Sequence, residues 1–149
     1  MDKVVIQRDK IEDIEYILRK ICAIVKRKGR EILDDFPITP PQFVGLQWLN
    51  EEGDMTIGEL SNKMFLAFST TTDLVDRMEK NQLVERVRGE KDRRVVRIHL
   101  LDKGREIIQD VIEARRDYLA DIIAEMNKEQ VNQIADSLEL LFKSMSKDM

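Results

Sequence analysis

The sequence has few of the residues that cross-link or interrupt a chain: one cysteine, three prolines and six glycines among 149 residues. A single cysteine excludes an internal disulfide and favours a reducing compartment, so we expect a cytoplasmic protein. Few prolines and glycines, with only 5% aromatic residues, are typical of a mainly helical chain. No apolar run reaches the roughly 18 residues of a membrane span, and no signal-peptide pattern is found. We therefore expect neither a membrane contact nor export.

Groupings of side chains for catalysis or metal binding are also missing. The only histidine, His99, lies in a predicted strand, where a solvated or hydrogen-bonded ring is more common than a general base. Cys22 has no histidine at a catalytic spacing, and the sequence has no glycine-rich phosphate loop or CxxC pair. Carboxylates are scattered over wet helix faces, as in most helical proteins. We therefore expect no enzyme, no metal site and no cofactor.

The stretch 55–80 predicts two short amphipathic helices joined by a tight turn. Thr56 and Glu59 form a capping signal for the first helix. The apolar spacing breaks at 65–68 and restarts at Ser69, the predicted N-cap of the second helix. The second helix has inward positions Leu74, Val75 and Met78, and outward positions Thr70, Thr71, Thr72, Asp73, Asp76 and Arg77. Two such helices are typical of a helix-turn-helix.

A predicted β-hairpin follows the two helices. Residues 83–88 alternate apolar and charged side chains, which is the period of a strand with one wet face. Residues 95–100 predict a second strand, and 89–94 between them have turn chemistry with three cations. A helix-turn-helix followed by a basic hairpin is a winged helix.

The residues from Leu60 to Arg105 resemble the MarR family of bacterial winged helix-turn-helix regulators. The family's wing signature, D-x-R-x-x-x-x-x-L-T, is matched by Asp92, Arg94 and Leu100, while its last position is Leu101 instead of threonine. We therefore expect Asp102 to cap the next helix. A glycine that usually precedes the wing is Gln82 here, so we expect Asn81 to take the left-handed conformation instead. With the long helices on either side, the resemblance covers essentially the whole chain.

The net charge of −4 is divided unevenly along the chain. Residues 83–105 contain eight cations and four anions, a net charge of +4, whereas the remainder contains 17 cations and 25 anions, a net charge of −8. Phosphate affinity depends on local positive potential, so an acidic remainder does not argue against nucleic acid binding. Five arginines around a predicted hairpin favour a phosphate-binding surface over a wet strand face that happens to be basic.

Long amphipathic helices are predicted at both ends of the chain, over about 9–34 and 102–147, and a capping signal at Asn127 and Gln130 begins a new helix within the second stretch. Residues 1–8 are expected to fray. The apolar stripes of these helices are wider than one winged head can cover, so we expect them to form the dimerisation region of a homodimer. The expected fold is a single, mainly α domain with a small β-hairpin, in which about 39–100 form the winged helix-turn-helix.

The expected function is sequence-specific binding of double-stranded DNA at a roughly palindromic operator, and the resemblance implies that the protein is a repressor. The helix 69–80 would enter the major groove. Residues expected at base edges are Thr70, Thr71, Thr72 and Asp73. Ser69 is also expected to bind DNA, and Arg77 is expected at a phosphate. The resemblance assigns Arg94 to the minor groove, Asp92 to support of the wing tip through a salt bridge, and Arg93 or Arg88 to phosphates.

Three residues outside this surface have two interpretations each. Trp48 lies on a predicted helix that begins with the capping signal Thr39–Gln42 and ends at Gly53. Trp48 and Phe36 are either core residues or the lining of a pocket for a small aromatic or amphipathic effector. Cys22 is either a packed thiol or a redox sensor, as in some members of the family. A winged helix that binds a protein partner is the alternative function from another class.

Overall fold

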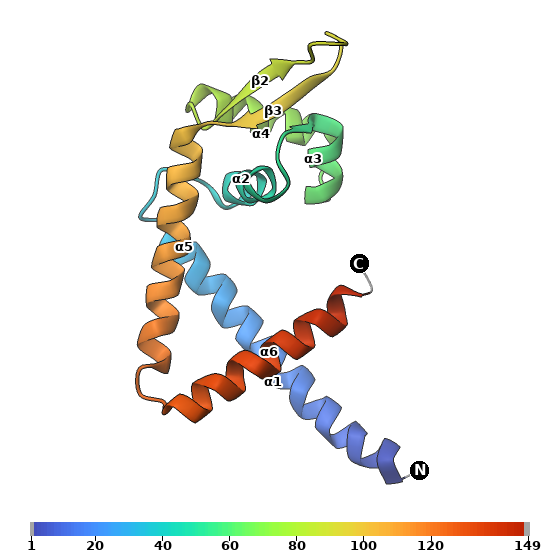
Figure 1. Cartoon of the computed structure of the whole chain (residues 1–149), viewed down its shortest axis with the longest axis vertical. Helices are drawn as coiled ribbons and strands as arrows, with labels where there is room; N and C mark the ends of the chain where they lie inside the picture. The colour runs from blue at the N-terminus through green and yellow to red at the C-terminus, as the bar shows by residue number, and fades with distance from the viewer. Residues whose placement is uncertain (1, 148–149) are drawn as a thin grey trace. The chain divides into compact units, whose positions relative to one another are not determined.

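The computed structural model describes residues 2–147, with side chains from Gln7 onward, and confirms the predicted fold class. The chain divides into two compact units whose boundary in the sequence falls between Ile112 and Glu113. The elements are α1 (Asp2–Leu33), α2 (Pro40–Glu52), β1 (Met55–Thr56), α3 (Ile57–Met64), α4 (Phe68–Lys80), β2 (Val84–Arg88), β3 (Val96–Leu100), α5 (Asp102–Ile123) and α6 (Lys128–Ser146) (Figure 1). None of the described helices is long and apolar enough to cross a membrane.

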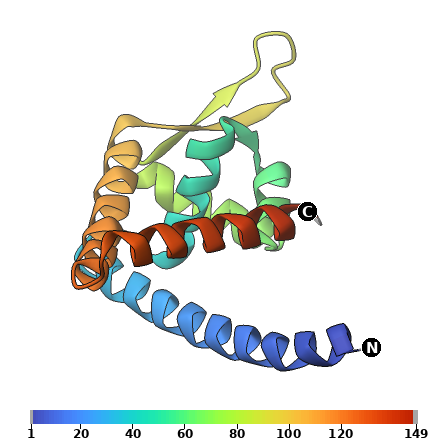
Figure 2. The same ribbon diagram turned by 60° about the horizontal axis from the view of Figure 1, so that its bottom comes forward.

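The predicted hairpin is present as β2 and β3, and a third strand joins it. The three strands form one antiparallel sheet in the order β1-β3-β2. Arg86 pairs with Ile98 across the hairpin, and Ile98 also pairs with Met55 of β1. Two residues are too short to show an alternating pattern, so β1 was not predicted. The loop 89–95 projects from the rest of unit 1 (Figure 2).

The predicted capping signals position the helices of the winged part. The Thr39 hydroxyl accepts a hydrogen bond from the Gln42 N–H, and the Gln42 side chain accepts one from the Thr39 N–H. Gly53 ends α2 at φ 85°, a conformation that favours glycine. The Thr56 hydroxyl accepts from the Glu59 N–H at 3.1 Å and starts α3. These local signals fix where each helix begins, before any packing.

The core of unit 1 lies where α2 packs against α3, α4 and β3. Its fully buried large side chains are Phe43, Leu46, Leu60, Met78, Leu83, Ile98, Ile108, Val75, Val84 and Val111. A Cβ added at Gly45 of α2 would lie at ordinary van der Waals distances from the side chains of Met64 and Met78, so α2 faces α3 and α4 at this position. Of the three inward positions predicted for the second helix, Val75 and Met78 are buried, as predicted, and Leu74 is half-buried.

The left-handed residue after α4 is Gln82, with φ 64°, whereas Asn81 has φ −86°. The prediction that Asn81 would take this conformation in place of the family's glycine was therefore wrong. The N–H of Leu83 donates to the carbonyl of Met78 across this turn, which requires the chain to reverse at Gln82 itself. A second residue with positive φ, Phe65 at 56°, ends α3.

The beginning of α5 lies against the base of the wing. The Leu101 N–H donates to the Leu83 carbonyl at 3.0 Å, and the Lys103 ammonium donates to the Asn81 carbonyl at 3.1 Å. A Cβ on Gly104 would lie 2.6 Å from the Leu83 carbonyl oxygen, so only glycine fits. Leu101 accepts the first helical bond, from Arg105, and is thus the N-cap. The expected cap Asp102 lies inside the helix instead, where it pairs with Arg105.

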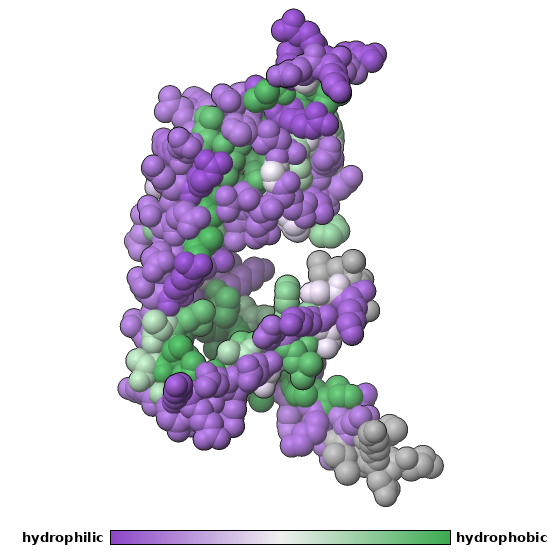
Figure 3. Space-filling view, viewed as in Figure 1, coloured by the Kyte–Doolittle hydropathy of each residue, from purple (hydrophilic) through white to green (hydrophobic). Residues whose placement is uncertain are grey.

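Helices α1 and α6 expose most of their described apolar side chains. Residues 2–8 are helical in α1, so the prediction that residues 1–8 fray was wrong for this stretch, while residue 1 lies outside the described residues. Asn127 caps α6 through a capping box with Gln130, as predicted. Among the described residues, α6 buries none. Apolar side chains are visible on the surface of these helices, whereas the wing tip is covered by hydrophilic ones (Figure 3).

Candidate nucleic-acid interface

Helix α4 begins at Phe68, one residue before the predicted start. Ala67 is the N-cap, and it has no side-chain hydrogen bond to the helix. Ser69 is therefore not the N-cap that its hydroxyl suggested. Four of the six predicted outward positions of α4 are exposed, namely Thr70, Asp73, Asp76 and Arg77, and Ser69 is exposed as well.

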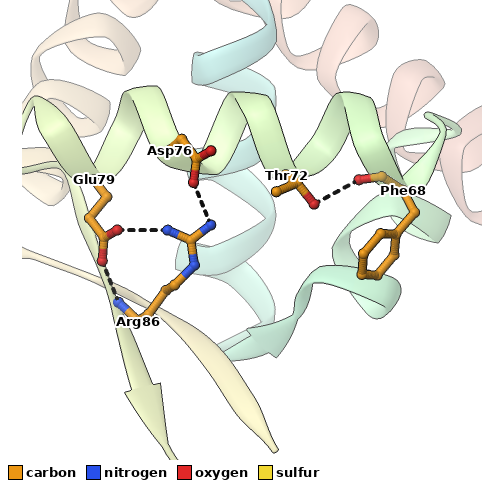
Figure 4. A network of polar contacts seen from close by, with 5 residues as sticks. All are labelled: Phe68, Thr72, Asp76, Glu79 and Arg86. Carbon is orange, nitrogen blue, oxygen red and sulfur yellow. Dashed lines mark hydrogen bonds and ion pairs between the residues drawn. The ribbon is translucent and has the colours of Figure 1, made fainter.

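Two threonine hydroxyls of α4 are used within the helix. Thr71 is fully buried, and its hydroxyl donates to the Ala67 carbonyl at 3.1 Å. The prediction that Thr71 faces outward and reaches a base edge was wrong, because Thr71 lies four residues before Val75 and seven before Met78 and therefore on their core-facing side. Thr72 is half-buried and donates to the Phe68 carbonyl at 3.0 Å (Figure 4). The free hydroxyls on the outer face are those of Ser69 and Thr70.

Arg86 of β2 links the wing to α4. Its guanidinium donates to Glu79 at 2.6 Å and to Asp76 at 2.7 Å, and its backbone N–H donates to the second Glu79 oxygen at 3.1 Å (Figure 4). Partial burial lowers the pKa of Arg86, but the hydrogen bonds to Asp76 and Glu79 outweigh it and leave the pKa above its ordinary value. The wing strand and the helix are thus joined by three hydrogen bonds to charged groups.

The wing tip is shaped by Asp92 and Arg94. One Asp92 oxygen accepts from the Arg94 backbone N–H at 3.0 Å and from its Nε at 3.1 Å, and the other accepts from its Nη2 at 3.2 Å. Hydrogen bonds from the Arg94 side chain, and then from its backbone, hold the pKa of Asp92 below its usual value. The predicted salt bridge is confirmed, and the Arg94 guanidinium is exposed with a fixed carboxylate beside it.

Cations without a carboxylate partner surround this tip. Arg93 and Arg97 are exposed, as is Lys91, and no carboxylate of the described residues lies within 4.0 Å of their charged groups. Arg88 donates to the Arg93 carbonyl at 2.9 Å, which braces the loop across its width. A Cβ on Gly89 would lie 2.7 Å from the Asp92 carbonyl oxygen, so the turn is closed tightly there. The tip therefore presents positive charge on a constrained loop.

The other predicted site residues lie away from this surface in the sequence. Trp48 is half-buried with the Lys63 ammonium 5.2 Å from its ring centroid, and Phe36 is also half-buried. The surface has a shallow hollow at residues 89–97 of the wing and another at residues 102–110 of α5. Neither of these two hollows is lined by Phe36 or Trp48. Cys22 is exposed on α1.

The His99 ring is hydrogen-bonded, as expected for a histidine on this strand. Its Nδ1 lies 2.8 Å from an Asp54 carboxylate oxygen at the edge of the sheet. The described residues contain no group of three or more histidine, cysteine or acidic side chains that could hold a metal ion.

Sequence reasoning missed the Arg86 contacts and two exposed phenylalanines. Arg86 was counted among the basic residues of the wing, although Asp76 and Glu79 occupy its guanidinium. The available signal was that Asp76 and Glu79 are three residues apart, and so lie on one side of a helix that is followed by a strand with a cation, Arg86. Phe65 and Phe68 lie at the predicted break between two helices. The available signal for them was the presence of two aromatic side chains in a short uncharged turn.

Comparisons with known proteins agree with this architecture. The model of the MarR family matches residues 38–96. The chain is 60% identical to YsmB, an HTH-type transcriptional regulator of Bacillus subtilis (strain 168), over 92% of this chain and 94% of YsmB. It is 26% identical to the HTH-type transcriptional repressor MdtR of the same organism, over 84% of this chain and 81% of MdtR.

A solved structure gives the same result. The structure of a MarR family protein from Bacillus stearothermophilus has a TM-score of 0.86 and 54% sequence identity, covering 93% of this chain and 97% of that one. Sequence identity above one half, over nearly the full length of this chain and of its relative, shows that the two share a fold and a family. The chain belongs to the MarR family of HTH transcriptional regulators.

Proposed function

We propose that the chain is a sequence-specific DNA-binding repressor that acts as a homodimer. The observation that carries the proposal is the link through Arg86, which holds the cationic wing in a fixed relation to the exposed face of α4. A helix that reads bases and a cationic loop that contacts the backbone must engage the same duplex together, so a fixed relation between them favours binding. The repressor MdtR among its relatives supports the direction of regulation.

The test is selection of bound duplexes from a random library, followed by gel-shift with the recovered sequences. We expect a two-fold symmetric consensus, because a dimer presents two copies of α4 about one helical turn, roughly 34 Å, apart. Binding should weaken with added salt, since the wing displaces counterions from the phosphates. Absence of any enriched sequence would favour the alternative function, in which the winged helix binds a protein partner.

Exposed apolar side chains on the long helices support the homodimer. On α1 these are Ile11, Ile14, Ile17, Ile21, Ile24 and Val25, and on one face of α6 they are Ile134, Leu138, Phe142 and Met145. Exposed apolar side chains repeated along one face of a helix mostly mark an interface between chains. Sedimentation at micromolar concentration should give a dimer, and a well-folded monomer would contradict the proposal.

A ligand that weakens DNA binding is the second part of the proposal, and Trp48 is its probe. We propose that a small aromatic or amphipathic effector binds near Phe36 and Trp48, and that it quenches Trp48 fluorescence as DNA is released. The half-buried indole with a cation over its ring suits an aromatic ligand. Release by peroxide alone, blocked in Cys22→Ser, would instead assign the response to the exposed thiol.

A further inference from the structure

Two phenylalanines at the turn between α3 and α4 are strongly exposed. Phe65 is 94% exposed and Phe68 is 62% exposed, the highest fractions among the large apolar side chains described in unit 1. Unlike the apolar residues of α1, they do not lie on a long helix. Each ring leaves a large apolar area in water, and neither contributes to the core around α2.

The backbone at Phe65 gives a second reason to look for a role outside the fold. Its φ of 56° is in the left-handed region, where a residue with a side chain is strained and glycine is not. Glycine would end α3 with less strain and with no exposed ring. Neither local conformation nor packing therefore accounts for a phenylalanine at this position.

The chemistry around the two rings is apolar and uncharged. No charged residue occurs from Phe65 to Thr72. Thr71 and Thr72 use their hydroxyls within the helix, as described above. The Phe68 ring projects from the start of α4, next to Thr72 (Figure 4). This end of the helix therefore offers two aromatic rings beside the hydroxyls of Ser69 and Thr70, which is poor chemistry for binding phosphate.

We propose that Phe65 and Phe68 contact the C5-methyl groups of thymines in the major groove, an inference that rests on the DNA-binding function proposed above. The thymine methyl is the apolar feature that base edges present in this groove, and aromatic side chains contact it. Residues at the start of a recognition helix are the ones that reach base edges. The unpaired cations of the wing favour a polyanion as the occupant, rather than an apolar protein surface.

The test removes the methyl groups from the DNA and the rings from the protein. The tightest duplex from the selection is prepared with thymine replaced by deoxyuridine, one position at a time. At one or two symmetric positions, loss of the methyl should weaken binding of the unmodified protein by about fourfold per half-site, the scale of one buried methyl group. Phe68→Ala should bind the thymine and uracil duplexes equally at those positions.

Phe65→Gly separates the fold from the contact. It should raise the midpoint of urea unfolding, because strain is relieved, and should nevertheless weaken binding to the thymine duplex. Val44→Ala, at another exposed apolar side chain of unit 1, is the matched control and should leave binding unchanged.

The outcomes distinguish this inference from the function on which it rests. If the protein enriches no duplex, the DNA-binding function itself fails. If it binds a selected duplex but is insensitive to every uracil, or if Phe68→Ala keeps the sensitivity of the unmodified protein, the methyl contact is wrong although DNA binding stands. Unchanged affinity in Phe65→Gly would restrict the contact to Phe68.

Discussion

Gln82 carries a side chain at φ 64°, where a glycine would be unstrained. Gln82→Gly should raise the free energy of unfolding by about 1 kcal/mol, because relief of left-handed strain exceeds the extra freedom that glycine has in the unfolded chain. Urea denaturation measures the change. Asn81→Gly is the control: at φ −86° it should lower stability, and an equal gain in both variants would exclude strain as the cause.

Variants of two arginines distinguish contacts that position the protein on the DNA backbone from contacts that recognise bases. Arg94 is held by Asp92 at the tip of the wing, whereas Arg77 is exposed on α4. Arg77→Ala should weaken binding to operator and random duplex alike, as loss of a phosphate contact does. Arg94→Ala should lose more on the operator, by about 1–3 kcal/mol per subunit, if its guanidinium enters a narrow A·T-rich minor groove.

Binding to both duplexes across a salt series measures this difference. Asp92→Ala should resemble a weaker form of Arg94→Ala, because it loosens the tip but keeps the cation. Equal losses on both duplexes for Arg94→Ala would make the wing an electrostatic contact only, and would leave base reading to the start of α4.

The contact between α4 and β2 has an electrostatic consequence for the whole element. Arg86→Ala leaves the carboxylates of Asp76 and Glu79 unpaired on α4, where they repel phosphate. It should weaken DNA binding by about tenfold, the scale of one hydrogen-bonded charge pair, although its guanidinium is already occupied. Adding Asp76→Asn and Glu79→Gln to this variant should recover part of the loss, as measured by fluorescence anisotropy.

Failure of the triple variant to recover would mean that Arg86 acts by fixing the angle of β2 and not by neutralising charge. Circular dichroism of each variant provides the control for folding, because the three residues are not in the core.

Helix ends and strands were predictable where a local signal determines them. Thr39, Gly53 and Asn127 cap their helices as expected, because each cap is made by residues within four positions. The burial of Thr71 was predictable, because Thr71 lies four residues before Val75 and seven before Met78, and so shares the helix face of these two inward positions. The partners of Arg86 lie seven and ten residues away on another element, and such contacts depend on tertiary packing that periodicity does not encode.

At the scale of the whole molecule, α6 tests the homodimer. Leu138, 57% exposed, lies on the stripe formed by Val131, Ile134, Leu141 and Met145, whereas Leu140, 70% exposed, lies on the opposite face of the helix. Leu138→Asp should convert the dimer to monomers and abolish operator binding, because an interface would bury an unpaired charge at a cost of several kcal/mol, roughly 3 or more.

Leu140→Asp is the matched control and should leave the dimer intact. Sedimentation velocity and gel-shift on the same samples measure both effects. Dissociation by both variants, or by neither, would contradict an interface built on this stripe.

The close contact at Gly104 makes the connection between α5 and the wing rigid. The Leu83 carbonyl is tied to Leu101 and leaves no room for even a methyl group at position 104. The first turn of α5 therefore contacts the segment that ends α4 directly, and a rotation of this turn toward Leu83 would require the segment to move as well. Any side chain at position 104 would push the first turn of α5 away from Leu83, at the base of the wing.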